Sequence, residues 1–351
     1  SEGFSQRVCL KLALPFLRED QSFVQMVQRE ARLAAKLRHS NIVGVLDYGS
    51  VDDTPYMALE LVDGVDLLCL LEERHQLRFE FVALLAIELA KGLSHAHNPL
   101  SSSDLDDSAS GLQAGIVHRD ISPSNVMLSQ QGEVLLTDFG VAKAMSGASR
   151  HQSAVKGKIP YMSPEQLRNE SLDGRSDLFS LGVVLYECLA GSRPYDGGND
   201  PATIMRILQG DHPPLWQVAR DAPREFRDVV DGLLEADRDA RPATASELIA
   251  QLDDFAPSPR IQQELGSIVT ELRRESLKRI EELESNRDTA EAVSAVLQSG
   301  VLPSAALPDP GPLGEEPEQQ GGKHVSVSAI LAVTIVAAML VGIFLFATRL
   351  V

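Results

Sequence analysis

Residues 118–125 read H-R-D-I-S-P-S-N, and residues 138–140 read D-F-G. The two stretches carry two carboxylates, Asp120 and Asp138, and one amide, Asn125. Phosphoryl transfer needs a carboxylate that orients the attacking hydroxyl, and it needs a carboxylate and an amide that hold the Mg²⁺ ions bridging the phosphates. The order and spacing of these three side chains therefore predict a site for phosphoryl chemistry.

Further motifs follow in a matching order along the chain. V-C-L-K at residues 8–11 resembles the strand whose lysine contacts the α- and β-phosphates, and S-P-E at residues 163–165 resembles the A-P-E that closes an activation segment. Asp177 opens an apolar helical run, and Arg241 lies in the sequence D-A-R-P. Over roughly residues 6–255, the chain closely resembles the bacterial (Hanks-type) Ser/Thr protein kinase family, in its H-R-D-x-S-P-x-N subgroup.

This resemblance implies an α+β, two-lobed protein kinase-like fold that binds ATP and Mg²⁺ and acts on protein substrates. Asp120 would orient the substrate hydroxyl, and Lys11 would clamp the phosphates. Asn125 and Asp138 would be the Mg²⁺ ligands. In the family, an aspartate in the place of Asp177 braces the catalytic loop.

The resemblance also places the adenine site and the activating phosphate. Leu59 would be the gatekeeper, and the backbone from Glu60 to Val62 would meet the adenine. Arg241 would pair with the glutamate of S-P-E, and Arg119 would meet a phosphate on the activation segment. The candidate serines for that phosphate are Ser146, Ser149 and Ser153.

Glu30 can be placed without the family. Apolar residues recur at helical spacing over residues 21–38, and Glu30 falls inside that stripe. A carboxylate that faces a core needs a partner. Lys11, on the preceding strand, is the expected cation, and this is the lysine–glutamate pair that active protein kinases require. A solvated glutamate beside Arg29 and Arg32 is the alternative.

The sequence predicts three consecutive parts. The first is the kinase domain, the second is a charged helical and Pro/Gly-rich linker, and the third is a transmembrane helix. Their boundaries are 1–255 (small lobe 1–62, large lobe 63–255), 256–324 and 325–347. Within the large lobe, residues 79–97 predict a long helix, and the acidic, serine-rich residues 98–115 predict a disordered insertion.

The predicted transmembrane helix is 23 residues long and carries no charge, whereas a bilayer core needs about 20 apolar residues. The kinase domain is expected to face the cytoplasm, where ATP is available. The formal net charge of −18 argues against nucleic-acid partners, which demand basic surface. The three cysteines show no C-x-x-C spacing, so neither a zinc site nor a disulfide framework is indicated.

Residues 259–299 alternate charges densely and predict an exposed helix or helical pair. Its apolar positions follow a nearly heptad spacing, which would suit a homodimer. These positions are Ile261, Leu265, Ile268, Leu272, Leu277, Ile280 and Leu283.

The chain departs from the family pattern at three places. The small lobe lacks the glycine-rich loop, whose last glycine would fall before Ser1. Either the sequence is a fragment, which the presence of every catalytic residue favours, or it is an inactive pseudokinase scaffold. The usual lysine of H-R-D-x-K is Ser122, and the usual threonine before A-P-E is Lys158. Lys158 either replaces the missing cation at the transferring phosphate or points to solvent.

Overall fold

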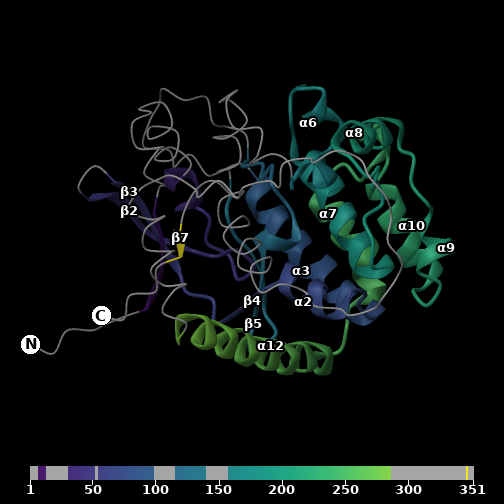
Figure 1. Ribbon diagram of the computed structural model, residues 1–351. Coiled ribbons are helices and arrows are strands. Elements are labelled where there is room, and N and C mark those ends of the chain that lie inside the picture. Colours follow the sequence, from purple (N-terminus) through teal and green to yellow (C-terminus); the bar gives the residue numbers. More distant parts are fainter. Residues whose placement is uncertain are drawn as a thin grey trace, which may run out of the picture.

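The computed structural model describes residues 7–12, 31–51, 54–98, 115–139, 157–285 and 345–346. These ranges form a lobe built on a β-sheet and a larger, mainly helical lobe (Figure 1). The predicted two-lobed α+β arrangement is therefore confirmed. Most of the insertion predicted at 98–115, all three candidate serines and Glu30 lie outside the described residues.

The small lobe contains an antiparallel sheet in the order β2-β3-β1-β7. Its strands are β1 (Val8–Leu12), β2 (Val45–Val51), β3 (Thr54–Glu60) and β7 (Leu345–Phe346). Side chains two positions apart on a strand share a face. Cys9 lies opposite Leu59 and Lys11 lies opposite Met57, so Lys11 shares the buried face of the sheet with Cys9. Of the helix predicted at 21–38, the structure describes only the end, which is helical at residues 31–34.

Strand β7 differs from the sequence prediction. Leu345 and Phe346 fall inside the predicted transmembrane helix, yet they pair with Leu12 and Lys11 of β1. The open edge of β1 offers unpaired backbone groups, which a short apolar segment can pair with. In the part of the chain that the structure describes, no helix is both long and apolar enough to cross a bilayer. Residues 325–344 lie outside that part.

A second small sheet brings the two decisive sequence stretches together. It has the order β4-β5-β6 and consists of β4 (Gly64–Asp66), β5 (Val126–Ser129) and β6 (Val134–Leu136). β5 and β6 are antiparallel neighbours, so the residues that precede β5 lie beside those that follow β6. Thr137 N–H accordingly donates to Asn125 O over 3.0 Å.

The large lobe is built around the long helices α3 (Phe79–His97) and α7 (Gly174–Ala190), which contact each other and are buried along most of their length. The helix predicted at 79–97 is confirmed. Around them lie α2 (Leu67–Arg74), α6 (Pro164–Leu167), α8 (Asp200–Gln209), α9 (Leu215–Val218), α10 (Arg224–Leu233) and α11 (Ala245–Leu252). Short 3₁₀ turns occupy Pro123–Asn125, Ile159–Tyr161, Arg238–Ala240 and Asp253–Phe255.

The predicted insertion leaves and re-enters the fold at one point. Ile116 N–H donates to Ala96 O over 2.7 Å, so the chain returns directly beside the end of α3. The entropy cost of closing a loop between adjacent ends grows only slowly with the number of residues in the loop. The catalytic stretch therefore starts from the same place that a short link would provide.

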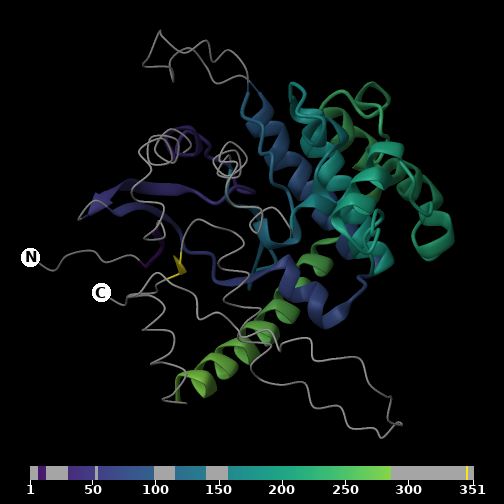
Figure 2. The ribbon, with the colours of Figure 1, turned by 45° about the horizontal axis from the view of Figure 1, so that its top comes forward.

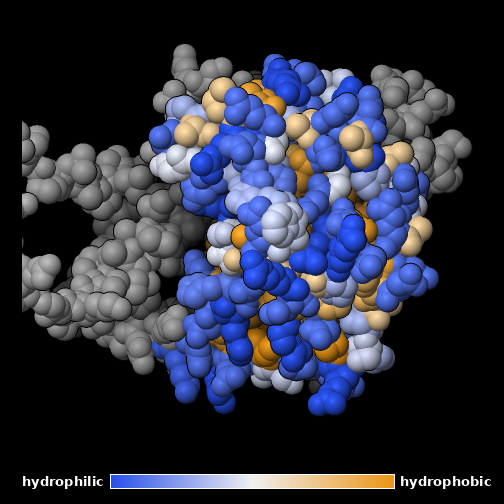
Figure 3. Space-filling model, turned by 90° about the vertical axis from the view of Figure 1, so that its right-hand side faces the viewer, coloured by the Kyte–Doolittle hydropathy of each residue, from blue (hydrophilic) through white to orange (hydrophobic). Residues whose placement is uncertain are grey.

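The face of the large lobe that carries α9 and α10 is mostly hydrophilic (Figure 3). Small apolar patches interrupt it. Trp216 on α9 is 59% exposed and Met205 on α8 is 53% exposed. Single exposed apolar side chains of this kind are ordinary on a solvated surface.

Helix α12 (Pro259–Ser285) follows the 3₁₀ turn after α11 and crosses beneath β4, β5 and α2 (Figures 1 and 2). Leu265 and Val269 are fully buried against the large lobe. Gly132, at φ +77°, lets the β5–β6 turn touch the helix, since a Cβ there would lie 1.9 Å from Gln262 O. Arg273 of α12 pairs with Asp63 over 2.5 Å, just after the predicted hinge.

This packing corrects the prediction of an exposed helix. Ile261, Leu265, Ile268 and Leu272 belong to the hydrophobic core of the large lobe, so the first four heptad positions contact the chain's own kinase domain. An apolar stripe shows that a helix has a partner but does not say which one. Leu277 is 46% exposed, and the side chains of Ile280 and Leu283 lie outside the described ones.

Replacing Leu265 by Ala should lower the free energy of unfolding by about 2–5 kcal/mol, because it opens a cavity in a dry contact. Gln263→Ala, on the exposed face of the same helix, is the matched control and should change it by less than about 0.5 kcal/mol. Urea unfolding followed by circular dichroism measures both. Equal small effects would contradict the packing of α12.

Candidate active site

The catalytic loop is held by one buried carboxylate. Asp177, in the first turn of α7, is 1% exposed and accepts the backbone N–H groups of His118 and Arg119, each over 2.7 Å. Its Oδ2 also contacts His97 Nε2 over 2.7 Å. Arg119 has a left-handed backbone, with φ +69°, which a non-glycine residue adopts only when its surroundings enforce it. The expected brace from Asp177 is present in this geometry.

His118 links the catalytic loop to D-F-G. Its ring is fully buried, with Nε2 2.9 Å from Thr137 O and with the ring centroid 4.4 Å from that of Phe139. Asp138, between those two residues, has a left-handed backbone with φ +67°. The two sequence stretches therefore form one rigid unit.

Asp120 and Asn125 lie in direct contact. The Asn125 amide nitrogen donates to Asp120 O over 2.7 Å and to Asp120 Oδ2 over 2.8 Å. Both bonds use Nδ2, so the amide oxygen is not engaged by Asp120. Asp120 Oδ2 also accepts a hydrogen bond from Lys158 Nζ. The sequence left the direction of Lys158 open, and the structure excludes the solvent-facing alternative.

Lys11 forms a buried ion pair with Asp138. Burial alone would raise the pKa of Asp138, but the charge and hydrogen bond of Lys11, with smaller effects of Lys158 and His118, hold that pKa below its ordinary value. Asp138 is therefore a carboxylate at neutral pH. The predicted pairing of Lys11 with Glu30 stays a prediction, because Glu30 lies outside the described residues.

The oxygen donors suit Mg²⁺ bound to ATP. Mg²⁺ takes oxygen ligands, and it is usually held by one or two protein groups together with substrate phosphates. The ionised Asp138 and the Asn125 amide oxygen are such groups, and Lys11 beside them can meet phosphate oxygens. These residues therefore fit the metal and the nucleotide that the sequence predicts.

The predicted hinge joins the two lobes at the end of β3. Leu59 is buried in the small-lobe core with Cys9 and Met57. Glu60 N–H donates to Gly44 O over 2.8 Å, which fixes the start of the hinge. Val62 is half-buried. Glu60 ends β3, and Val62 lies in the segment that joins β3 to β4; their contact with the adenine stays a prediction.

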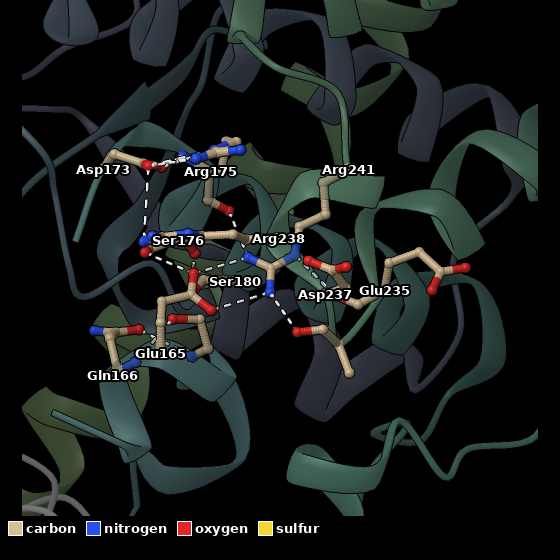
Figure 4. A network of polar contacts seen from close by, with 12 residues as sticks. Glu165, Gln166, Asp173, Arg175, Ser176, Ser180, Glu235, Asp237, Arg238 and Arg241 are labelled. Atoms are coloured by element: carbon tan, nitrogen blue, oxygen red, sulfur yellow. Dashed lines mark hydrogen bonds and ion pairs between the residues drawn. The ribbon is translucent and has the colours of Figure 1, made fainter. Parts of the chain in front are cut away.

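The glutamate of S-P-E and Arg241 form the expected pair (Figure 4). Arg241 donates through Nη1 to Glu165 Oε1 over 2.8 Å and through Nη2 to Glu165 Oε2 over 3.0 Å. Ser176 Oγ donates to the same carboxylate over 2.7 Å. Burial would raise the pKa of Glu165, but the hydrogen bonds from Arg241 and Ser176 and the charge of Arg241 hold it below its ordinary value.

Two positioning contacts were not predicted from the sequence. Gln166 Nε2 donates to Arg119 O over 2.8 Å and so ties α6 to the catalytic loop. The spacing of Ser163 and Gln166 is that of a capping box, which the structure contains, and this signal was readable in the sequence. Tyr161 OH donates to Glu187 Oε2 over 2.6 Å, a contact between distant segments that no local pattern reveals.

Residues 5–252 match the protein kinase domain family. The chain is 37% identical to the tyrosine-protein kinase MasK of Myxococcus xanthus over 260 residues, which cover 73% of this chain and 39% of that protein. It is 28% identical to the serine/threonine-protein kinase PrkC of Bacillus subtilis, with coverage of 75% and 38%. It is 33% identical to the serine/threonine-protein kinase PknB of Mycolicibacterium smegmatis, with coverage of 70% and 38%.

Among solved structures, the PknI kinase domain of Mycobacterium tuberculosis matches with a TM-score of 0.54 and 27% identity, covering 73% of this chain and 87% of that one. The fold and the site define a protein kinase catalytic domain. The chain belongs to the protein kinase family. It covers less than two fifths of the length of each of the three curated relatives named above.

Replacing Arg241 by Ala should destabilise the chain by about 3–5 kcal/mol, because it leaves the buried Glu165 carboxylate without its cation. Arg238→Ala is the matched control. Arg238 lies 3.9 Å from Asp173 and donates to Ser171 O over 2.9 Å, and both contacts are exposed, so its loss should cost no more than about 1 kcal/mol. Thermal unfolding measures the difference, and similar shifts for both variants would contradict the structural role of Arg241.

Proposed function

We propose that this chain is the kinase part of a membrane-anchored bacterial Ser/Thr protein kinase, which transfers the γ-phosphoryl group of ATP to a protein hydroxyl. The observation that carries the proposal is the convergence of Asp120, Asn125, Asp138 and Lys11 on one site. Relatives named as serine/threonine-protein kinases, PrkC and PknB, match the chain over most of its length.

Each residue has a separate task in the proposed reaction. Asp120 accepts a hydrogen bond from the substrate hydroxyl and orients its oxygen toward the γ-phosphorus. Asn125 and Asp138 hold Mg²⁺, which neutralises charge on the phosphates when it is bound. Lys11 contacts the phosphates. The ionised state of Asp138 supports its role as a ligand.

Arg119 is proposed to meet an activating phosphate on Ser146, Ser149 or Ser153. Among the residues that the structure describes, none forms a hydrogen bond with its buried Nε, although buried polar groups are almost always paired. A phosphate would supply charged acceptor oxygens for the guanidinium. Mass spectrometry of the active protein, together with the three Ser→Ala variants, tests the assignment.

Two other functions remain to be separated from this one by experiment. A pseudokinase scaffold would bind partners without transferring phosphate. The relative named as a tyrosine-protein kinase, MasK, favours a second hydroxyl class. ATP-dependent autophosphorylation of the complete gene product, followed by phosphoamino-acid analysis, tests both. Absence of transfer would overturn the proposal, and phosphotyrosine alone would overturn its Ser/Thr part.

Asp120→Asn should lower the rate of autophosphorylation about 10²- to 10⁴-fold, because it removes the carboxylate that orients the hydroxyl. Nucleotide affinity should stay nearly unchanged, since no phosphate ligand is lost. Asp138→Asn should weaken Mg²⁺-dependent nucleotide binding as well. Asp254→Asn, an exposed carboxylate, is the control and should retain full activity. Transfer rates and binding of a fluorescent ATP analogue separate the effects, and full activity of Asp120→Asn would overturn the role of Asp120.

The membrane anchor is proposed to be residues 325–347, on the basis of their uninterrupted uncharged sequence. Deleting residues 325–351 should release the protein from membranes into the soluble fraction, because the acidic chain has no polybasic patch that would hold anionic lipid. Deleting residues 300–322 instead, which keeps the predicted span, is the control and should leave the protein in membranes. Sedimentation of the first variant with membranes would show that another segment anchors it.

A further inference from the structure

A cavity of about 500 Å³ opens beside the catalytic loop. Ser122 and Ser124 of the catalytic loop line one side, and Lys158 and Tyr161 of the segment before S-P-E line another. Glu187, at the end of α7, lies in the same wall. Residues 122 and 158 are far apart in the sequence, yet both line this cavity, and Lys158 is also bonded to Asp120.

Residue 122 brings no charge to this cavity. Ser122 is 5% exposed, and its hydroxyl lies 3.1 Å from the Ser124 hydroxyl. Two cations line the cavity: Arg193 lies 3.5 Å from Asp196, whereas Lys158 is bonded to Asp120. The side chain of Lys158 is 15% exposed and that of Asp120 is 9% exposed, so water screens their ion pair weakly. Charge–charge attraction is stronger in such a partly buried site than at the surface, because the effective dielectric constant is lower.

Lys158 is bonded to Asp120, the group that receives the substrate hydroxyl. Asp120 is also bonded to Asn125, a proposed ligand of the Mg²⁺ on the phosphates. The ammonium of Lys158 is therefore next to the carboxylate at which the substrate oxygen attacks the γ-phosphorus.

The backbone of Lys158 is fixed relative to Asp120. Lys158 O accepts the N–H of Tyr161 over 3.0 Å, at the 3₁₀ turn whose Ile159 is buried. Ser180 of α7 donates to Tyr161 O over 2.7 Å, and Tyr161 OH is held by Glu187. These anchors fix the base of the Lys158 side chain beside the catalytic loop.

We propose that Lys158 is a catalytic residue of the phosphoryl transfer and stabilises the negative charge on the γ-phosphoryl oxygens from the cavity that it shares with Ser122. The inference rests on the proposed kinase function. In the step, the bond between the γ-phosphorus and the β,γ-bridging oxygen breaks while a bond forms to the substrate oxygen. The hydroxyl proton passes to Asp120, ADP carries away the electron pair of the broken bond, and Lys158 keeps its protons.

The ammonium of Lys158 donates to Asp120 before the phosphoryl group arrives and to a phosphoryl oxygen during transfer. A donor that meets developing charge in this way acts on the transition state rather than on nucleotide binding. Removing one such donor lowers turnover about 10²- to 10³-fold. An ion pair that merely blocked Asp120 would have the opposite effect, because its removal would free the carboxylate.

The experiment uses the complete gene product and measures kcat, KM for ATP and the affinity for a fluorescent ATP analogue. Lys158→Met should lower kcat at least 100-fold and leave the nucleotide affinity within about 3-fold. Lys158→Arg, which keeps the charge, should stay within about 10-fold of the wild type. Lys91→Met removes a surface lysine that pairs with Glu88, and as the control it should leave kcat unchanged.

An exchange of positions tests the location of the charge. Ser122→Lys combined with Lys158→Thr returns a cation to the same cavity, and it should recover at least 10-fold of the kcat that Lys158→Met loses. This double variant and Lys158→Arg decide the question if Lys158→Met does not fold, as judged by circular dichroism and nucleotide binding.

Near-normal or increased kcat in Lys158→Met would overturn the inference while leaving the kinase function intact. Failure of both Lys158→Arg and the double exchange in folded protein would also overturn it. A wild type that transfers no phosphate under the same conditions would overturn the proposed function, and the inference with it.

Discussion

The site depends on one buried carboxylate, that of Asp177. A carboxylate without partners inside a protein is very costly, whereas here two backbone N–H groups and His97 satisfy it. Each hydrogen bond to a charged group contributes roughly 1.5–3 kcal/mol, and the left-handed backbone of Arg119 costs roughly 1–3 kcal/mol. Two bonds from consecutive residues therefore outweigh the strain, and the loop stays in the shape that presents Asp120.

The neighbour of Asp177 along the chain, Ser176, holds the second half of the site. Its hydroxyl binds Glu165, whose carboxylate is clamped by Arg241, and Gln166 next to Glu165 reaches the catalytic loop at Arg119 O. The first turn of α7 thus orients the catalytic loop through one residue and the S-P-E segment through the next. Because both sets of contacts start from the first turn of α7, the catalytic loop and the S-P-E segment are held at a fixed distance, although dozens of residues separate them in the sequence.

Much of this fold could be predicted, because short patterns in the sequence indicate its main helices and the order of its motifs. Apolar periodicity predicted α3 and the buried run of α7, and motif order indicated that residues 118–125 lie beside D-F-G. The sequence predicts the apolar stripe on α12 but not that its first four positions pack on the kinase domain, since periodicity contains no information on what covers a face. The ion pair of Lys158 with Asp120 depends on a turn and a cavity formed by four distant segments, which no single window of sequence encodes.

The pair also shows why a missing motif residue is weak support for a missing function. Electrostatic stabilisation depends on where a charge lies in space and on how dry its surroundings are, and it does not depend on the position of the residue in the chain. A lysine stem spans several ångströms, so residues whose backbones belong to different segments can place an ammonium at one point. The effect of a serine at position 122 in place of the family's usual lysine therefore depends on the other charged side chains that line the cavity. In this chain the wall of the cavity contains Lys158, already bonded to the carboxylate that the missing cation would have served.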